Sequence, residues 1–256
     1  MLIELLNILD LSLPELGYVA LCVLLGAIIK GYSGFGASIF WMVSVSLALP
    51  PIQVVPMVLM FEVISSFYLL PGIWKDIQWK SISNLMIGTC IGTPVGIYAL
   101  TSLSDGTIRL ALAAVVLTTA MLLLRGFTLE KVPNKPATVG VGMLAGVLNG
   151  SMSIGGPPVV LFYFSAPIGI AVSRASIIAY FFGLDAVGTA MLWSQGLINE
   201  AVFWRAVLLI PLLLLGTLIG NQSYKKSNPD RFKKTALYIW VFLSIMLLIR
   251  VAWSFI

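Results

Sequence analysis

The stretches GYSGFG, from Gly31 to Gly36, and GSMSIGGPP, from Gly150 to Pro158, decide how this chain is organised. Each lies in an apolar run, 16–49 or 137–166, that is too long for one membrane crossing. As straight helices these runs would extend about 51 and 45 Å, against a hydrocarbon core of about 30 Å. Glycine permits unusual backbone angles, and a broken helix exposes amides and carbonyls that hydrocarbon cannot satisfy. Each break is therefore predicted to hold a polar group at membrane depth.

The composition places the whole chain in a membrane. Of its 256 residues, 59% are hydrophobic and 10% are charged, and the mean hydropathy is +1.03; a soluble domain does not reach such values. The chain contains no histidine and ten carboxylates, and its two cysteines, Cys22 and Cys90, lie in apolar runs. These numbers disfavour a metal site, a disulfide framework and acid–base catalysis. We expect an all-α polytopic membrane protein that is not an enzyme, with no catalytic residues, no cofactor and no metal.

The chain divides into two similar halves. GTPVG, starting at Gly92, and GTLIG, starting at Gly216, match at an offset of 124. We predict a first repeat at 1–125, a cytoplasmic linker at 126–136 and a second repeat at 137–256, all within one transmembrane domain. Each repeat has four apolar segments, at 16–49, 53–71, 80–101 and 107–125, and at 137–166, 175–194, 203–221 and 235–255.

The charges favour inverted repeats over a parallel duplication. If each glycine-broken first segment folds back as a discontinuous helix hairpin, each repeat makes three further crossings, and the second repeat is inverted. With the acidic N-terminus outside, the basic loops are then cytoplasmic, as the positive-inside rule requires. A parallel duplication would export either Lys75 and Lys80 or the loop at 221–234. The predicted cytoplasmic loops are 72–80 (Lys75, Lys80), 125–136 (Arg125, Lys131, Lys135), 167–174 (Arg174) and 221–234 (Lys225, Lys226, Arg231, Lys233, Lys234).

The external loops then carry Asp105 and Glu200 and no basic residue. We expect a multi-pass protein of the plasma membrane, the bacterial inner membrane, with the N-terminus and the C-terminus both external. The basic residues are dispersed among loops and form no stripe, so nucleic acid is not an expected partner.

The two motifs, KGYSGFGASIFWM and AGVLNGSMSIGGPPVVLFYF, each in the first segment of a four-segment repeat, resemble the TauE/SafE sulfite exporter family. The resemblance covers essentially the whole chain. The first motif departs from the more glycine-rich family form at Ala37 and Ser38. The resemblance implies a secondary transporter, an exporter, of sulfite, an organosulfonate or another small sulfur-containing anion.

The two breaks and their neighbours form the candidate substrate site. A helix that restarts at a break directs its positive dipole end and free amides at it, an arrangement suited to an oxyanion. Serine hydroxyls and one asparagine amide add further donors. The candidate substrate-binding residues are Lys30, Gly31, Tyr32, Ser33, Gly34, Phe35, Gly36, Ser38, Asn149, Gly150, Ser151, Ser153, Gly155 and Gly156.

Three ionisable residues lie within the apolar segments. Lys30 directly precedes the first break, and its counterpart 119 residues later is Asn149. An ammonium at that depth needs a cavity or a partner, so Lys30 binds the anion, pairs structurally with Glu62 or reaches for the surface. Glu62 and Asp185 lie near the middle of the second segment of each repeat and are the candidates for proton coupling; the alternative is a neutral carboxyl in a helix interface.

The sequence thus predicts a transporter of a small anion that alternates access around two glycine breaks, with proton coupling as an option. Two alternatives stay open: a membrane scaffold whose glycines only allow close helix packing, and a passive anion channel. The expected partners are the anion and the lipid bilayer, and a homodimer is compatible with this prediction.

Overall fold

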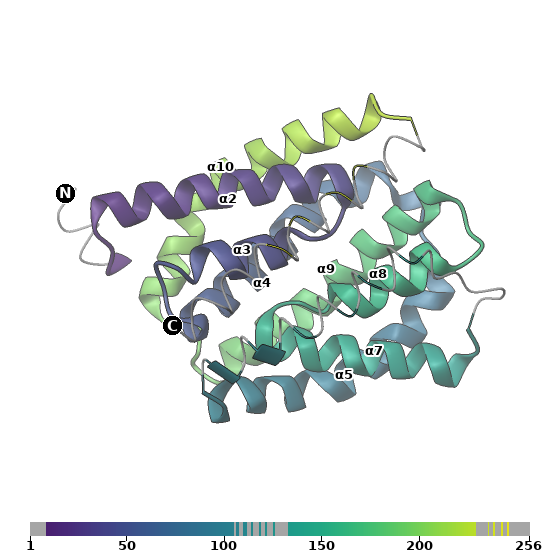
Figure 1. The fold of residues 1–256 in the computed structure, drawn as a ribbon, viewed down its shortest axis with the longest axis horizontal. Helices are drawn as coiled ribbons and strands as arrows, with labels where there is room; N and C mark the ends of the chain where they lie inside the picture. The colour runs from purple at the N-terminus through teal and green to yellow at the C-terminus, as the bar shows by residue number, and fades with distance from the viewer. Residues whose placement is uncertain are drawn as a thin grey trace.

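The computed structural model describes residues 9–104 and 133–228, together with single positions between 106 and 125 and between 235 and 245. Within these residues the only regular structure is helical, in an elongated bundle (Figure 1). The all-α class is therefore confirmed for the described part of the chain. Five of its helices are long and apolar enough to cross a membrane: Leu13–Ser33, Pro51–Gly72, Trp79–Ser102, Ile170–Ser194 and Glu200–Lys225.

The first long apolar run is broken where the sequence predicted. Helix α2 (Leu13–Ser33) ends before Gly34, and α3 (Ala37–Val45) begins after Gly36. Both glycines have φ 84°, in the left-handed region that a helix cannot continue through. The Tyr18 hydroxyl donates to the Ser44 carbonyl at 3.0 Å. Since Tyr18 is early in α2 and Ser44 is late in α3, α3 folds back along α2 as a hairpin.

The second long run is broken in the same manner. Helix α7 (Lys135–Met152) ends at Ser153, which has φ 54°, and α8 (Gly156–Ser165) follows. The remaining elements are α4 (Pro51–Leu69), the 3-10 turns η1 (Leu70–Gly72) and η2 (Trp74–Asp76), α5 (Trp79–Ser102), α9 (Ile170–Ser194) and α10 (Glu200–Lys225).

Helices α4 and α9 lie side by side at the centre of the bundle. Over their most apolar windows, 67% of the residues of the α4 segment and 61% of those of α9 are buried, against 33–44% for α2, α5 and α10. Most residues near the middle of α4 and α9 are therefore surrounded by protein, which is where ionisable residues within a membrane are found.

The outer helices pair across the two halves of the chain. Gly216 and Gly220 of α10 lie against the backbone of α2 between Leu24 and Tyr32. Gly92 and Gly96 of α5 lie against α7 in the same way. Residue numbers rise together in both pairs, so each pair is parallel, and the first apolar segment of each half packs on the third apolar segment of the other.

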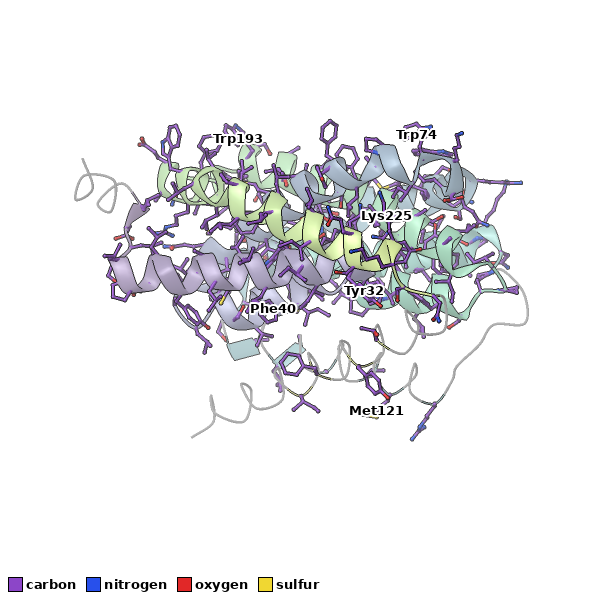
Figure 2. The ribbon with its side chains drawn as sticks, turned by 90° about the horizontal axis from the view of Figure 1, so that it is seen from above. Tyr32, Phe40, Trp74, Met121, Trp193 and Lys225 are labelled. Carbon is purple, nitrogen blue, oxygen red and sulfur yellow. The ribbon has the colours of Figure 1, made fainter. Side chains whose placement is uncertain are left out.

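Helix α5 has one exposed apolar face, as expected of a helix that faces lipid, and one glycine face against α7. Its face of Ile87, Ile91 and Val95 is more than half exposed, while Gly88 and Gly92 on the opposite face touch the α7 backbone. Small residues are thus inside and large apolar residues outside, which is the pattern of helices that pack within a membrane. Trp74, Trp79 and Trp204 are exposed near the ends of helices, as tryptophans at a membrane interface are. Figure 2 shows Trp74 and Trp193 far apart along the length of the bundle.

One end of the bundle collects the basic residues. Lys80 and Lys135 line a cavity of about 600 Å³ at the starts of α5 and α7. The Gln78 amide donates to the Ser176 hydroxyl of α9 at 3.0 Å, and the Tyr32 hydroxyl meets that of Ser227 at 3.0 Å. The ends of α2 and α10 and the starts of α5, α7 and α9 therefore share this end.

The opposite end of the bundle contains one buried arginine among the described residues, in the second turn of α10. Arg205 is buried there, and its guanidinium donates to the carbonyls of Leu9 and Asp10 and to the side chain of Gln53. The Asp10 carboxylate lies 3.5 Å from it, so Arg205 adds no uncompensated positive charge to this end. Several predicted loop charges, including Asp105, Lys131, Arg231, Lys233 and Lys234, lie outside the described residues, as do most of 107–125 and 235–255.

Candidate functional site

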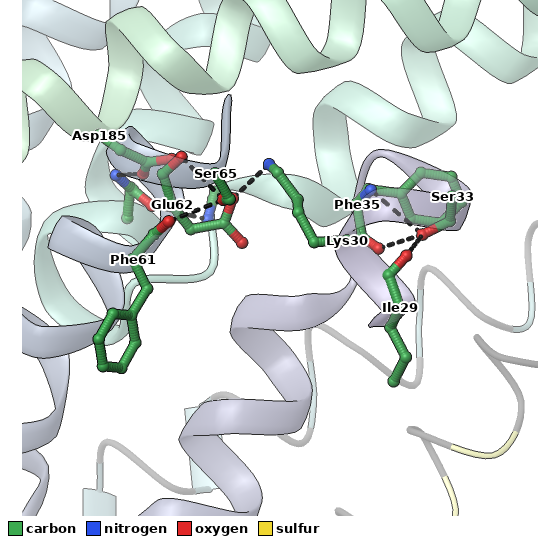
Figure 3. A network of polar contacts seen from close by, with 10 residues as sticks. Ile29, Lys30, Ser33, Phe35, Phe61, Glu62, Ser65 and Asp185 are labelled. Atoms are coloured by element: carbon green, nitrogen blue, oxygen red, sulfur yellow. Dashed lines mark hydrogen bonds and ion pairs between the residues drawn. The ribbon is translucent and has the colours of Figure 1, made fainter. Parts of the chain in front are cut away.

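The ammonium of Lys30 is paired with the carboxylate of Glu62 in the core of the bundle (Figure 3). Lys30 comes from the last turn of α2 and Glu62 from the middle of α4. Their exposed fractions are 0% and 2%. The Lys30 Nζ also lies 4.9 Å from the centre of the Phe181 ring, close enough for a cation–π contact. Both charges are thus removed from solvent and held by each other.

The second half of the chain makes the corresponding contact without a cation. Asn149 Nδ2, near the end of α7, donates to Asp185 Oδ1 of α9 at 2.8 Å. Asn149 Oδ1 accepts from the Gly155 amide at 3.3 Å, which ties this pair to the second break. Asp185 is also close enough to Glu62 and Lys30 to interact with them electrostatically. Lys30, Glu62, Asp185 and Asn149 thus form one polar cluster, which we call the central cluster.

Several buried polar atoms in or near the central cluster have no hydrogen-bond partner among the described residues: Glu62 Oε1, Ser66 Oγ, Thr189 Oγ1 and Ser153 Oγ. Ser66 follows Glu62 by four residues, and Thr189 follows Asp185 by four, so each hydroxyl lies on the same helix face as its carboxyl. A buried polar atom without a partner costs free energy and calls for a functional explanation. Binding of a polar solute at this cluster supplies one.

At the first break, α3 begins with Gly36 as its N-cap and no side-chain hydrogen bond. The Ser33 hydroxyl is used within the turn, because its single proton has the carbonyls of Ile29 at 2.7 Å and Phe35 at 2.5 Å as acceptors. Ser38, 8% exposed, lies in the first turn of α3. The first-turn amides of α3 have no partners within the helix, so they can bind an anion.

The second break offers fewer donors. Gly155 is the N-cap of α8, and its amide is already bonded to Asn149. Pro157 and Pro158 have no N–H. The Ser151 hydroxyl donates back to the Val147 carbonyl at 2.8 Å. The unpartnered Ser153 hydroxyl is therefore the main side-chain donor at this break.

Some of the predicted site residues serve packing in this structure. A Cβ at Gly31 would overlap the α10 backbone at Thr217, and one at Gly150 would overlap the α5 backbone at Thr93. Tyr32 reaches the end of α10, where its ring lies 6.5 Å edge-on from Tyr224. The other aromatic and glycine positions also touch side chains: Phe35 packs edge-on against Phe164 at 5.5 Å, Gly34 lies beside Ile178, and Gly156 lies beside Phe181.

The direction of the Lys30 side chain was not predictable from its position beside the break. In Figure 3 its ammonium points toward Glu62 and away from Ser33 and Phe35. The structure therefore brings Lys30 together with the two carboxyls and Asn149, and its ammonium points away from Ser33 of the first break.

Arg174 is the site residue whose role the sequence analysis missed. The sequence predicts a loop at 167–174, but α9 already begins at Ile170, and Arg174 is 2% exposed. Its guanidinium donates to the carbonyls of Gly31 at 2.6 Å and Tyr32 at 3.1 Å, and it stacks 3.8 Å from the centre of the Tyr224 ring. Arg174 thus holds the end of α2, next to the first break.

Comparisons with known proteins agree with the resemblance of the two motifs. A family model described as "Sulfite exporter TauE/SafE" matches residues 19–247. A protein of Cupriavidus necator named "Probable sulfite/organosulfonate exporter TauE" is 27% identical over 252 residues, which cover 95% of this chain and 98% of the relative. No solved structure matches the chain.

Proposed function

The chain belongs to the sulfite exporter TauE/SafE family, and we propose that it is a secondary transporter that exports sulfite, an organosulfonate or a similar small anion by alternating access. The name of the Cupriavidus necator relative supports this substrate class. The observation that carries the proposal is the buried central cluster. An apolar bundle gains no stability from burying Lys30, two carboxyls and unpartnered hydroxyls at its centre, so a transport function explains them better than folding does.

In this proposal Lys30 is the charged ligand of the anion. The first-turn amides of α3, with Ser38 and Gly36, supply uncharged donors on the first-repeat side. Asn149 and Ser153 contribute from the second repeat. Gly31 and Gly150 act indirectly, because their lack of a side chain allows α2 and α7 to approach α10 and α5.

Inverted repeats remain our proposed origin of the alternation. Helices α2 and α10 end at the basic end of the bundle, whereas α5 and α7 start there. The helix pair α2–α10 therefore runs in the opposite direction to the pair α5–α7. This is the relation expected of repeats inverted about an axis between α4 and α9. The gathering of Lys80 and Lys135 at one end supports a cytoplasmic assignment for it, with both chain termini outside.

Glu62 and Asp185 stay the candidates for carrying a coupled proton. Both are buried beside the cation, and both belong to the central helices that would have to change contacts in alternation. If one of them couples transport, its amide variant should still exchange anion but lose net transport driven by a pH gradient.

Counterflow into proteoliposomes tests the proposal. Vesicles that hold the purified protein and a high internal concentration of unlabelled methanesulfonate should transiently accumulate labelled methanesulfonate, and sulfite added outside should compete. A passive channel would show flux that follows voltage without counterflow. A scaffold, which the glycine-packed pairs α2–α10 and α5–α7 would also suit, would show no flux. Arg205→Lys, at the end of the bundle opposite the basic end, serves as the basic-residue control for Lys30→Met.

A further inference from the structure

We propose that the transported anion and the Glu62 carboxylate exchange places on Lys30, and that Glu62 takes up one proton from solvent when it is displaced. The inference rests on the proposed function, because it concerns how the same site binds its anion. It assigns to Glu62 the role of an internal anion that occupies the substrate's cation until the substrate arrives.

The contacts of Lys30 are the first support. Its ammonium is fully buried, and its partners in the structure are the Glu62 carboxylate and the face of the Phe181 ring. A second anion that joined Glu62 on Lys30 would place two negative charges against one ammonium in a low-dielectric interior, so its binding favours displacement of Glu62. Binding of the anion to Lys30 and release of Glu62 from Lys30 are therefore coupled.

The two oxygens of Glu62 are the second support. Oε2 meets Lys30, whereas Oε1 is buried and has no hydrogen-bond partner. Without Lys30 the carboxylate would be an unpaired charge in a low-dielectric interior, which is among the most costly arrangements in a protein. Neutralisation by a proton removes that cost.

The other charged groups around Glu62 leave Lys30 as its compensating cation. Asp185 of α9 is a second carboxyl, and it opposes a negative charge on Glu62. Asn149 of α7 is uncharged, and α3 carries no ionisable residue. The arginine of α10 that contacts α4, Arg205, binds Gln53 in the first turn of α4 and is already paired with Asp10.

The absence of a second lysine in the equivalent site makes the exchange specific to the first half. At the position that corresponds to Lys30, Asn149 donates a neutral hydrogen bond to Asp185. An anion that approaches Asn149 meets no ammonium there and displaces no ion pair. Asp185 thus provides a matched control for Glu62.

Calorimetric titration of the full-length protein in detergent with methanesulfonate tests the inference. The sulfonate stays ionised throughout the accessible pH range, so any proton that is taken up belongs to the protein. Titration in buffers of different ionisation enthalpy should give about one proton taken up per anion. Affinity should then weaken by about tenfold per pH unit as the pH rises.

The variants separate the two carboxyls. Glu62→Gln should abolish the proton uptake and make the affinity independent of pH and no weaker than that of wild type, because the competitor for Lys30 has lost its charge. Asp185→Asn should retain the uptake. Proton uptake that persists in Glu62→Gln, or that disappears only in Asp185→Asn, overturns the proposal.

Two further outcomes are informative. Binding of methanesulfonate to the wild type without proton uptake overturns the exchange and leaves the proposed transport function standing, whereas absence of binding of both methanesulfonate and sulfite overturns both. If Glu62→Gln does not fold, infrared difference spectra of the wild type decide the matter. Addition of methanesulfonate should produce the carbonyl band of a protonated carboxyl, and its absence contradicts the proposal.

Discussion

Asn149 contacts Asp185 through a 2.8 Å hydrogen bond from its amide, and the same amide group accepts the Gly155 N–H of the second break. The corresponding contact of the first half is the Lys30–Glu62 ion pair. The two halves therefore share one geometry but differ by one charge. Because of this difference, Lys30 is the one cation of the central cluster.

Replacement of Lys30 by Met should destabilise the protein by about 3–5 kcal/mol, because it leaves the Glu62 carboxylate buried without its cation. The double variant Lys30→Met with Glu62→Gln should recover most of this loss. Both variants should bind the anion ten- to hundredfold more weakly, for the loss of a charge-assisted contact of about 1.5–3 kcal/mol. Denaturant unfolding and calorimetry measure the two effects. Wild-type affinity in the stable double variant would remove Lys30 from the site.

The close packing of α2 on α10 and of α5 on α7 should be sensitive to substitution of the glycines between them. Gly92→Val and Gly220→Val should each lower stability by more than about 1–3 kcal/mol, since a Cβ at either position would overlap the backbone of the partner helix. Gly140→Val is the control, because a Cβ there has no atom within 4 Å. Thermal unfolding in detergent measures the differences. Equal stability of all three variants would show that the helix backbones do not approach each other closely at Gly92 and Gly220.

The sidedness of the chain can be mapped with single cysteines in a background where Cys22 and Cys90 are replaced by Ala. Cysteines at Lys75 and Ser227 should react only from the cytoplasm, because they belong to the basic end. Cysteines at Ser104 and Ile198 should react with an impermeant maleimide from outside. Labelling of Lys75 and Ser227 from opposite sides would rule out the inverted arrangement.

Arg174→Lys should weaken the attachment of α2 to α9, even though it keeps the positive charge. A lysine cannot donate to the carbonyls of Gly31 and Tyr32 and stack on Tyr224 as a planar guanidinium does. A loss of about 1.5–3 kcal/mol is expected, together with faster proteolysis near the first break. Lys225→Arg at the same end is the control. If unfolding and proteolysis match the wild type, Arg174 does not hold the end of α2.

The positions of both helix breaks could be predicted from the sequence because their causes are local. A run too long for one crossing must be interrupted, and glycine tolerates the positive φ that Gly34 and Gly36 adopt. The pairing of Lys30 with Glu62 could be named as an alternative for a similar reason, since an ammonium in an apolar segment needs a partner and carboxylates there are few.

What each glycine and each charge faces was decided by the tertiary structure alone. Gly31 and Gly150 belong to the break motifs, yet they lie against α10 and α5, because the first helix of each half packs on the other half. From the sequence, Arg174 is a loop charge. In the folded protein it lies on α9 and donates to the Gly31 carbonyl near the end of α2. Spacing along a chain fixes where a helix ends and which residues share its face, whereas the neighbour of that face depends on contacts between segments more than a hundred residues apart.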